Sequence, residues 1–413
     1  MSRLDELIQE YCPDGVNYRK LEDCCTVLDK KRKPVTKAAR EAGEYPYYGA
    51  NGIQDYVSDY IFDGTFVLVG EDGSVITKAG TPVVTWAEGK IWVNNHAHII
   101  EETDGVLLRY LFHYIQTIDV TPLIHGNIPK LTGGDFRALQ IPVPPLPVQS
   151  EIVRILDNFT ELTAELTAEL TARKKQYEYY RDKLLTCDDN IAVKRIGDIT
   201  RVFSASRVHK DEWTTEGVPF YRSSDVISYF NGVENSRGKA YISKELYEKL
   251  SAKSGKICKD DILITGGGTI GVPYIVPNDD PIYMKDADLL CIQHSKEFDS
   301  RYLYHYFLST LFRDYLKGIT HDATIPHYTI SQICETPVPL PTLDVQKRIV
   351  NVLDNFDAIC SDLKIGLPAE IEARQKQYEF YRDTLLTYAA TGKTILTDRQ
   401  TDRQTDRQTS IMR

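Results

Sequence analysis

The sequence predicts an α+β protein in which two tandem α+β domains are separated by two long helices that form an antiparallel intramolecular coiled coil. Three observations predict this fold class. A segment in the middle of the chain recurs near its end, strand-like segments precede each copy, and each copy carries an apolar stripe at helical spacing. The expected boundaries are 1–146 and 188–340 for the domains, 147–187 and 341–391 for the helices, and 392–413 for a tail.

The repeated segment occupies residues 141–186 and again residues 336–387. Its closing stretches, Arg173–Thr186 and Arg374–Thr387, differ at only three aligned positions, 174/375, 179/380 and 183/384. A repeat this strong indicates a duplicated chain.

The composition is that of an ordinary globular protein, with 42% apolar and 10% aromatic residues among 413. The N-terminal stretch is acidic and amphipathic, unlike a signal peptide, and the chain has no charge-free apolar run of about 18 residues. The eight cysteines are scattered without a CxxC pair, which favours reduced structural thiols. These features predict a cytoplasmic protein.

The first domain is expected to begin with a short helix around Leu4, Leu7 and Ile8, and to end with a helix over 106–118 whose apolar residues share one face. Between them, apolar and aromatic runs bounded by Gly, Asn, Asp or Pro favour strands. The expected strands are 16–28, 47–52, 66–70, 82–85 and 90–93.

The second domain repeats this plan, although most of its residues differ. Residues 193–198 resemble 18–23, and the clearest match is RYLFHY at 109–114 with RYLYHY at 301–306. The chain is therefore predicted to alternate a variable domain with a conserved helix, twice.

The first conserved helix should run unbroken, because neither Gly nor Pro occurs from Val148 to Leu185, and it would reach ~57 Å at 1.5 Å per residue. Its apolar stripe needs another helix, which favours a coiled-coil pair over the alternative of two independent surface helices. Gly366 and Pro368 should break the second helix, with Pro368 in the first turn of its continuation. The expected spacer residues are Phe159, Leu162, Leu166, Leu170, Tyr177, Tyr180, Phe356, Leu363, Leu367, Ile371, Tyr378 and Tyr381.

The conserved helices differ in length by one unit of a leucine tetrad, which occurs at 163–166 and 167–170. Arg173 lies fourteen residues after Phe159, whereas eighteen residues separate the equivalent positions in the second copy. Each tetrad adds ~6 Å and ~40° of rotation to an ideal helix. The pair is thus predicted to be a spacer whose length changes in steps.

Taken together, these features resemble the specificity subunit of type I restriction–modification enzymes. The resemblance rests on the duplicated layout, the leucine tetrads, the segments Leu146–Gln149 and Asp344–Gln346 that open the helices, and the endings RKKQYEYYRDKLL and RQKQYEFYRDTLL; it covers about residues 1–390. It implies that each variable domain is a target-recognition domain for one half of a split DNA sequence. The conserved helices would space the halves and dock two methyltransferase subunits.

The resemblance further implies double-stranded DNA as a partner and, in a larger assembly, restriction or translocase subunits. S-adenosylmethionine would bind the methyltransferase, so no cofactor is expected on this chain. Because the domains differ in sequence, the target should be asymmetric. The net charge of −10 fits weak DNA binding by the lone chain, with partners supplying much of the phosphate contact. It also suits the alternative of a two-headed structural adaptor that binds proteins without DNA specificity.

Candidate DNA contacts are basic and polar loop residues, since Lys and Arg bind phosphates and amides or hydroxyls read base edges. The expected phosphate contacts are Lys30, Lys31, Arg32, Lys33, Lys37, Arg207, Lys210, Arg237 and Lys239. The expected base contacts are Tyr47, Tyr48, Asn51, Gln54, His209, Arg222, Ser223, Ser224, Thr269, His321 and His327. The competing interpretations are a solvated basic loop at 30–37 and an ordinary turn with core tyrosines at 47–54.

Catalytic and metal-binding motifs are weak. The run GGGTIG at 266–271 lacks the Lys-Ser/Thr of a P-loop, so a tight turn is favoured. His96 and His98 have no further clustered ligands in the sequence, so structural roles are favoured and no metal is expected. The adenine methyltransferase motifs Asn-Pro-Pro-Phe/Tyr and Asp-Pro-Pro-Tyr do not occur, so the chain is predicted to be non-catalytic.

The tail repeats TDRQ from Thr397 and is expected to be disordered. ACAGACAGACAG encodes Thr-Asp-Arg-Gln as a pure ACAG repeat. The hypothesis is that slippage in such a tract changes the reading frame after about Leu396. Mixed codons without a four-base period in the coding strand would exclude it.

Overall fold

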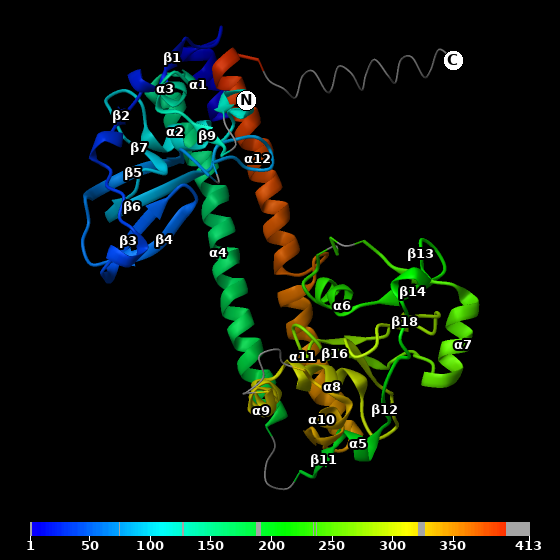
Figure 1. Ribbon diagram of the computed structural model, residues 1–413. Coiled ribbons are helices and arrows are strands. Elements are labelled where there is room, and N and C mark those ends of the chain that lie inside the picture. The colour runs from blue at the N-terminus through cyan, green and yellow to red at the C-terminus, as the bar shows by residue number, and fades with distance from the viewer. Residues whose placement is uncertain are drawn as a thin grey trace, which may run out of the picture. The chain divides into compact units, whose positions relative to one another are not determined.

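The computed structural model describes residues 2–73, 75–125, 128–186, 191–233, 235–236, 238–320 and 327–393 (Figure 1). The chain forms two compact units: unit 1 comprises Met1–Glu165 and Glu372–Arg413, and unit 2 comprises Leu166–Ile371. Each unit therefore combines one variable domain with parts of both conserved segments. The TDRQ repeats lie outside the described residues. Across the described ranges, no helix combines the length and apolar character needed to span a membrane.

Unit 1 is an α+β structure built on one main sheet. Its helices are α1 (Arg3–Tyr11), η1 (Leu21–Asp23), η2 (Asp29–Lys31), η3 (Lys37–Ala39), α2 (Leu108–Ile115), η4 (Thr121–Leu123), α3 (Gly133–Arg137), the first half of α4 (Leu146–Leu185) and most of α12 (Leu367–Thr391). Its strands are β1 (Tyr18–Lys20), β2 (Thr26–Val27), β3 (Ala42–Gly49), β4 (Gly52–Val57), β5 (Phe62–Gly70), β6 (Val84–Val93), β7 (Ala97–Glu101), β8 (Ile124–His125), β9 (Lys130–Leu131) and β10 (Gln140–Pro142).

The main sheet of unit 1 has the strand order β2-β7-β5-β6-β3-β4, which makes β4 an edge strand. Side chains alternate across the sheet, as strand geometry requires. Val67 and Val69 of β5 belong to the core shared with the helices, whereas Phe66 and Leu68 belong to a second core of strand residues. The sheet is therefore buried on both faces along β5.

Two strand predictions for unit 1 are wrong in detail. The strand expected over 16–28 is divided, because η1 turns the chain between β1, which pairs with β10, and β2, which joins the main sheet. The strands expected over 82–85 and 90–93 are one strand, β6, which pairs with β5 along its length. Gly89 allows this continuity by adopting φ +78° opposite Gly64, a conformation that glycine tolerates.

Unit 2 has the same plan with different strands. Its helices are the second half of α4, α5 (Ile196–Ile199), η5 (Lys210–Glu212), α6 (Ser223–Phe230), α7 (Lys244–Ser254), α8 (Ser300–Leu308), α9 (Thr310–Thr320), α10 (Ile330–Glu335) and α11 (Leu343–Ser361). Its strands are β11 (Val193–Arg195), β12 (Val202–Ser204), β13 (Trp213–Thr214), β14 (Val218–Tyr221), β15 (Tyr241–Ile242), β16 (Ile262–Thr265), β17 (Pro273–Ile275), β18 (Tyr283–Met284), β19 (Leu289–Ile292) and β20 (Pro337–Pro339).

The strands of unit 2 form two four-stranded sheets, β12-β19-β16-β17 and β13-β15-β14-β18, and the pair β11-β20. This pair repeats β1-β10 of unit 1. The hydroxyl of Tyr302 in α8 donates to the Pro339 carbonyl over 2.8 Å, just as Tyr110 in α2 donates to Pro142 over 2.9 Å. The predicted duplication is thus confirmed down to individual hydrogen bonds.

In unit 1 the start of α4 packs against the end of α12. Ile152 of α4 and Leu386 of α12 share a core. Further along α4 but earlier in α12, Phe159 stacks on Tyr381 with ring centroids 5.2 Å apart. Because residue numbers rise along one helix as they fall along the other, the two helices are antiparallel.

In unit 2 the second half of α4 packs against α11. Tyr177 and Tyr180 stack on Phe356 with ring centroids 6.3 and 5.6 Å apart, and Leu185 shares a core with Leu353. The expected antiparallel helix pairing is therefore confirmed, with α4 paired to α12 in unit 1 and to α11 in unit 2. The remaining aliphatic spacer residues of these helices are half-buried: Leu162, Leu166, Leu170, Leu367 and Ile371.

The second conserved segment breaks where the sequence predicts. Residues 362–366 separate α11 from α12, and Pro368 lies in the first turn of α12. A Cβ on Gly366 would lie 2.6 Å from the Ala358 carbonyl oxygen, so the break needs a glycine. Leu363 falls within the break and is 59% exposed, so its assignment to the buried spacer stripe is wrong.

Candidate nucleic-acid interface

Four lysines of unit 1 form an exposed basic surface, called here the lysine surface. Lys30 and Lys31 lie in η2, Lys33 follows it, and Lys37 begins η3. The backbone that carries them is held in place: the Lys33 N–H donates to the Val93 carbonyl over 3.2 Å, and Trp92 Nε1 donates to the Lys33 carbonyl over 2.7 Å. The ammonium groups thus face solvent above a fixed backbone.

Arg32, in the middle of the same segment, turns inward. Its Nη1 lies 2.6 Å from a carboxylate oxygen of Glu71 and 2.5 Å from the Ala97 carbonyl oxygen, and its Nε donates to the Asp29 carbonyl over 2.9 Å. Its charge is therefore neutralised within unit 1. This arrangement removes Arg32 from the expected phosphate contacts and makes it a structural cation.

Asp29, Glu71 and His98 lie together beside Arg32, with ligand atoms within 4.8 Å of one another. His98 Nδ1 is 2.8 Å from Asp29 Oδ2, and its Nε2 is 3.0 Å from the Leu131 carbonyl oxygen. Burial would raise the pKa of Asp29, but the hydrogen bond with His98 and the charge of Arg32 outweigh it and lower the pKa. Arg32 Nη1 lies 2.6 Å from Glu71 and its Nη2 lies 3.7 Å from Asp29, so both carboxylates of this group are paired with its positive charge.

Tyr47 and Tyr48 of β3 are core residues. Tyr47 is 1% exposed, and its hydroxyl lies 3.0 Å from the backbone nitrogen and 3.3 Å from the carbonyl oxygen of Val35. Tyr48 is buried in the second core. Neither ring can reach a base edge, so the competing interpretation as core tyrosines is correct and the expected base contacts are withdrawn.

The tip of the β3-β4 hairpin, in contrast, is exposed. Asn51 lies in its turn and Gln54 on β4, both exposed, and Ile53 and Tyr56 are 47% and 52% exposed. Asn94 Nδ2 donates to Gln54 Oε1 over 3.3 Å. This edge hairpin therefore presents two amides and two apolar side chains.

In unit 2, two of the expected base contacts are structural. Arg222 is 9% exposed, and it donates hydrogen bonds to the Asp225 carboxylate from Nε over 2.8 Å and from Nη2 over 2.9 Å. Ser223 is equally buried and donates to the Asp288 carbonyl over 3.1 Å. Both side chains are buried and hydrogen-bonded inside the unit, so neither is positioned to reach a base edge.

The other candidates of unit 2 lie at its surface. Thr269 and His327 are exposed in neighbouring segments, because Gly267 pairs with His327. Ser224 is half-buried and accepts a hydrogen bond from Asn235 over 3.1 Å. The remaining exposed candidates are Arg207, His209, Lys210 and Lys239. Two further candidates, Arg237 and His321, lie outside the described residues.

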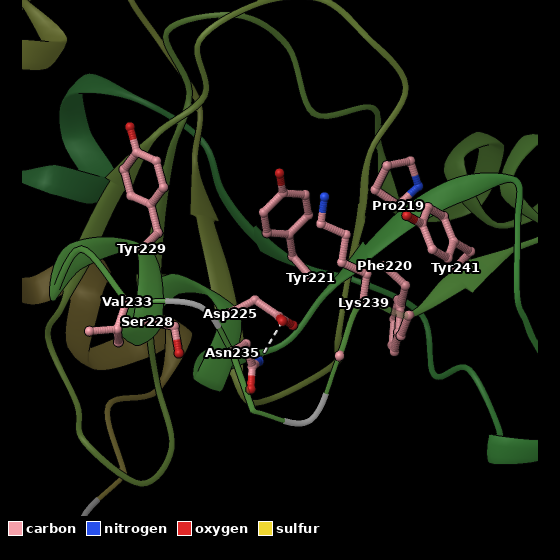
Figure 2. A pocket seen from close by; sticks show the side chains of 12 residues that line it. Pro219, Phe220, Tyr221, Asp225, Ser228, Tyr229, Val233, Asn235, Lys239 and Tyr241 are labelled. Carbon is pink, nitrogen blue, oxygen red and sulfur yellow. Dashed lines mark hydrogen bonds between the residues drawn. The ribbon is translucent and has the colours of Figure 1, made fainter. Parts of the chain in front are cut away.

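A pocket of about 430 Å³ opens beside Lys239 in unit 2 (Figure 2). Figure 2 shows the ring of Tyr221 beside the Lys239 side chain and the ring of Tyr229 further away, with the hydrogen bond between Asn235 and Asp225 drawn below them. Tyr229 is 70% exposed. Aromatic rings can stack on a base, and a lysine beside them can bind a phosphate. The lining of this pocket therefore suits a nucleotide.

Unit 1 also contains a polar cluster, junction 1, made of Arg109, His113, Asp157 and Tyr378, in which His113 and Tyr378 are buried. Arg109 Nε lies 2.7 Å and His113 Nε2 lies 2.9 Å from Oδ1 of Asp157. His113 Nδ1 lies 2.8 Å from the Tyr378 hydroxyl. Because a carboxylate only accepts, Nε2 carries the proton and Nδ1 accepts from Tyr378.

Unit 2 repeats the cluster as junction 2, made of Arg301, His305, Asp354 and Tyr177. Arg301 Nε and His305 Nε2 lie 3.0 and 2.7 Å from Oδ1 of Asp354, and the Tyr177 hydroxyl lies 3.0 Å from His305 Nδ1. Each tyrosine comes from the conserved helix of the other repeat. Junctions 1 and 2 therefore tie each variable domain to the helix that its own repeat does not supply.

Sequence reasoning missed the junctions, although a signal was present. The arginine and histidine come from the matching segments 109–114 and 301–306, and the aspartates come from LDNF at 156–159 and 353–356. Gln149, in the segment that opens the first conserved helix, is fully buried and accepts from the Leu107 N–H over 2.9 Å. Polar residues repeated in both halves were a sign of shared internal contacts.

Acid is expected to destabilise both units through the junction histidines. Burial lowers the pKa of His113 and His305, against the opposing hydrogen bonds to Asp157 and Asp354. A histidine whose pKa is lowered by folding stabilises the fold when neutral, so its contribution is present above about pH 6.5 and is lost as the pH falls. Burial would raise the pKa of each aspartate, but the hydrogen bonds lower it, so the aspartate contribution is lost only below about pH 4.

Thermal unfolding at pH 7.5 and pH 5.5 measures this effect. The unmodified chain should melt at a lower temperature at pH 5.5, and the double variant His113→Gln/His305→Gln should lose most of that difference. His209→Gln, a change at an exposed histidine, is the control and should keep it. If the double variant keeps the full difference in melting temperature between pH 7.5 and pH 5.5, groups other than these two histidines cause the acid sensitivity.

Comparison with known proteins identifies the family. The sequence matches the type I restriction modification DNA specificity domain over residues 13–173 and again over residues 188–373. It is 37% identical over 385 residues to a putative type I restriction enzyme specificity subunit of Haemophilus influenzae, covering 91% of this chain and 96% of that protein. It is 30% identical over 307 residues to the type I restriction enzyme EcoR124I/EcoR124II specificity subunit of Escherichia coli, covering 70% of this chain and 72% of that protein.

The fold is also similar to the crystal structure of a type I restriction–modification system S subunit from M. genitalium. The TM-score is 0.51 at 16% sequence identity, over 91% of this chain and 96% of that chain. Each matched sequence range contains one variable domain followed by conserved helix, as the duplicated fold requires. The chain therefore belongs to the type I restriction modification DNA specificity domain family.

Proposed function

We propose that this chain is the DNA-recognition subunit of a type I restriction–modification enzyme and that it reads a split, asymmetric target, one block with each variable domain. The observation that carries this is duplication with divergence. The two units share a strand pair, a helix and a junction, yet one presents the lysine surface and an edge hairpin and the other an aromatic pocket. Different surfaces read different sequences, and family membership favours DNA over the protein-adaptor alternative.

The surviving surface candidates divide by chemistry. In unit 1 the lysine surface meets phosphates, while Asn51 and Gln54 meet base edges. In unit 2 the phosphate contacts are Arg207, Lys210 and Lys239, and the base contacts are His209, Ser224, Thr269 and His327. Arg237 and His321 remain candidates from sequence alone.

The partners are methyltransferase subunits, two for each chain. Tyr179 and Phe380 occupy equivalent positions in the two repeats and are 60% and 43% exposed. Each follows its junction tyrosine by two residues, so the chain offers two equivalent apolar surfaces, and exposed aromatic rings of this kind favour protein contacts. This chain is non-catalytic, and S-adenosylmethionine binds the methyltransferase. Restriction subunits join the larger assembly.

A selection from a random DNA pool tests the proposal. The chain is incubated with the pool alone and with its co-expressed methyltransferase subunit, and the bound DNA is sequenced. The complex should enrich two short, different blocks at a fixed separation, whereas the lone chain should enrich them weakly because of its net charge of −10. If the complex enriches no split motif, the adaptor alternative is favoured.

The lysine surface makes a separate prediction. Replacing Lys30, Lys31, Lys33 and Lys37 with alanine should weaken binding of the complex to target and unrelated DNA alike, because phosphate contacts carry no sequence information. The slope of log affinity against log salt should become shallower by ~0.9 for each lost phosphate contact. The control is Lys20→Ala/Lys376→Ala, two exposed lysines paired with glutamates. If the slope of log affinity against log salt does not change, residues 30–37 form a solvated loop that does not contact DNA phosphates.

A further inference from the structure

We infer that Gln54 reads one base of the half-site of unit 1 through its amide N–H, and that Asn94 and Gly49 are the positioning residues that fix this orientation. The inference rests on the proposed function and deepens it. The Gln54 amide N–H is the reading group, and it recognises a hydrogen-bond acceptor on a base edge. Neither Asn94 nor Gly49 was singled out by the sequence.

The hairpin that carries Gln54 is placed to enter a groove. β4 is the edge strand of the main sheet, and it pairs on one side only, with β3, so the β3-β4 hairpin forms the edge of the sheet that can approach the major groove. Ile53 and Tyr56 of the same strand are also exposed, and they add apolar surface to the hairpin that can contact a thymine methyl group. The hairpin thus combines an amide with apolar surface, as direct base readout requires.

Two residues of the lysine surface, Lys33 and Lys37, lie beside this hairpin. A hydrogen bond from Arg40 lowers the pKa of Asp55 on β4, and the nearby charge of Lys37 adds to the effect. The end of β6 joins the two surfaces: Trp92 and Val93 hold the backbone of Lys33, and the next residue, Asn94, holds Gln54. Three consecutive residues therefore hold both the backbone of a phosphate-binding lysine and the side chain that contacts a base. The phosphate contacts should fix the position of the hairpin on the DNA and so decide which base Gln54 meets.

Asn94 sets the orientation of the Gln54 amide. Asn94 is 2% exposed, its N–H donates to the Tyr48 carbonyl over 3.1 Å, and its Oδ1 accepts from the His96 N–H over 2.8 Å. Because Asn94 Oδ1 accepts from a backbone N–H, the Asn94 atom that faces Gln54 is the donor Nδ2. Gln54 therefore accepts this hydrogen bond with Oε1. Among the described residues no acceptor meets Nε2 of Gln54, so its donors are available to an acceptor on DNA.

The Gln54 side chain packs against the backbone of Gly49. A Cβ on Gly49 would lie 2.1 Å from Nε2 and 2.3 Å from Cδ of Gln54. The Gln54 side chain therefore lies directly over the backbone of Gly49, and only glycine leaves the space. A side chain that is already ordered loses less conformational entropy on binding, which sharpens discrimination.

An outward amide donor selects among the four bases. In the major groove guanine offers N7 and O6, adenine offers N7 and thymine offers O4 as acceptors, whereas cytosine presents the N4 donor. Unit 1 should therefore reject cytosine at the base that Gln54 meets. The Nε2 donors fit guanine best, because it offers two acceptors side by side.

The test is the methylation motif of the reconstituted complex of this chain with its methyltransferase, read by sequencing methylated adenines in a DNA library. Gln54→Glu leaves only acceptors at this position and should move the preference at one base of one half-site toward cytosine or adenine, which offer the N4 and N6 donors, by about tenfold. Asn94→Asp can only accept, so it should turn the Gln54 amide around and move the preference toward adenine or cytosine, which offer donors. Gly49→Ala should displace Gln54 and leave that base degenerate.

The half-site read by unit 2 is the internal control and should stay unchanged in all three variants. A purely structural role predicts a lower yield at every site with the same motif, and that result would overturn the inference. Gln54→Glu, a change at an exposed side chain, keeps the test informative if either buried substitution fails to fold. If the unmodified complex shows no split motif, the proposed function fails and the inference fails with it.

Discussion

Ending the chain at Gly366, before α12, is expected to unfold unit 1 and to leave the core of unit 2 in place. The core of unit 1 takes Tyr378, Leu386 and Ala389 from α12, whereas among the described residues the core of unit 2 extends no further than Cys360. Burying a large apolar side chain contributes ~1.5–3 kcal/mol, and a domain is stable by only ~5–15 kcal/mol. Losing α12 therefore removes a large fraction of the stability of unit 1, although the deletion is far from its variable domain in sequence.

Hydrogen exchange measured by mass spectrometry separates the two units. In the shortened chain, peptides from 1–165 should exchange rapidly and peptides from 191–361 should stay protected. A chain ended after Lys393, which keeps every described core residue, is the control and should exchange like the full chain. Protection of peptides from 1–165 in the shortened chain would show that unit 1 does not depend on α12.

Deleting one tetrad, residues 163–166, is expected to change the gap in the DNA target by one or two base pairs and to leave both half-sites unchanged. The deletion shortens α4 by ~6 Å and changes its rotation by ~40°. DNA rises ~3.4 Å per base pair and completes a turn in ~10.5, so these changes correspond to about two and about one base pair respectively. The methylation motif of the variant complex measures the gap directly.

The matched control keeps the length of α4 and changes only its side chains. Thr163→Ala/Thr167→Ala replaces two tetrad threonines that are not fully buried, so it should retain the original gap. If the deletion lowers methylation without moving the gap, the gap is set by something other than the length of this helix.

The fold was predictable where the information in the chain is repetitive. The duplicated stripes predicted two helices, the spacing of tyrosines and leucines predicted their pairing, and Gly366 with Pro368 predicted the break after α11. Periodicity reports which face of a helix is buried, and steric exclusion reports where a helix ends. The buried face of a helix and the position where it ends can both be predicted from one sequence, because neither requires knowing which element the helix packs against.

The surface candidates were predicted less well, because residue type does not tell which way a side chain points. Arg32 and Arg222 both turn inward, and each has an aspartate three residues earlier or later, Asp29 or Asp225. That spacing was a usable sign of a local ion pair. The lysines around Arg32 have long flexible side chains that face solvent, whereas a planar guanidinium is better suited to a buried pair.

The junctions could not be assigned from local pattern. His113 and Tyr378 are 265 residues apart in sequence, and His305 and Tyr177 are 128 apart. The repeat makes each histidine equally compatible with either tyrosine, and only the antiparallel helix pairing decides that the partners are exchanged. Asn94 is similar, since its contact with Gln54 depends on the return of β6 beside β3.

The central claim is that two different variable domains read two different blocks of one DNA target. Sequencing the methylated adenines produced by the complex of this chain with its methyltransferase tests this most directly. The account predicts one asymmetric motif of two short, unlike blocks separated by a gap of fixed length. A palindromic motif, a continuous motif or methylation without a motif would contradict it.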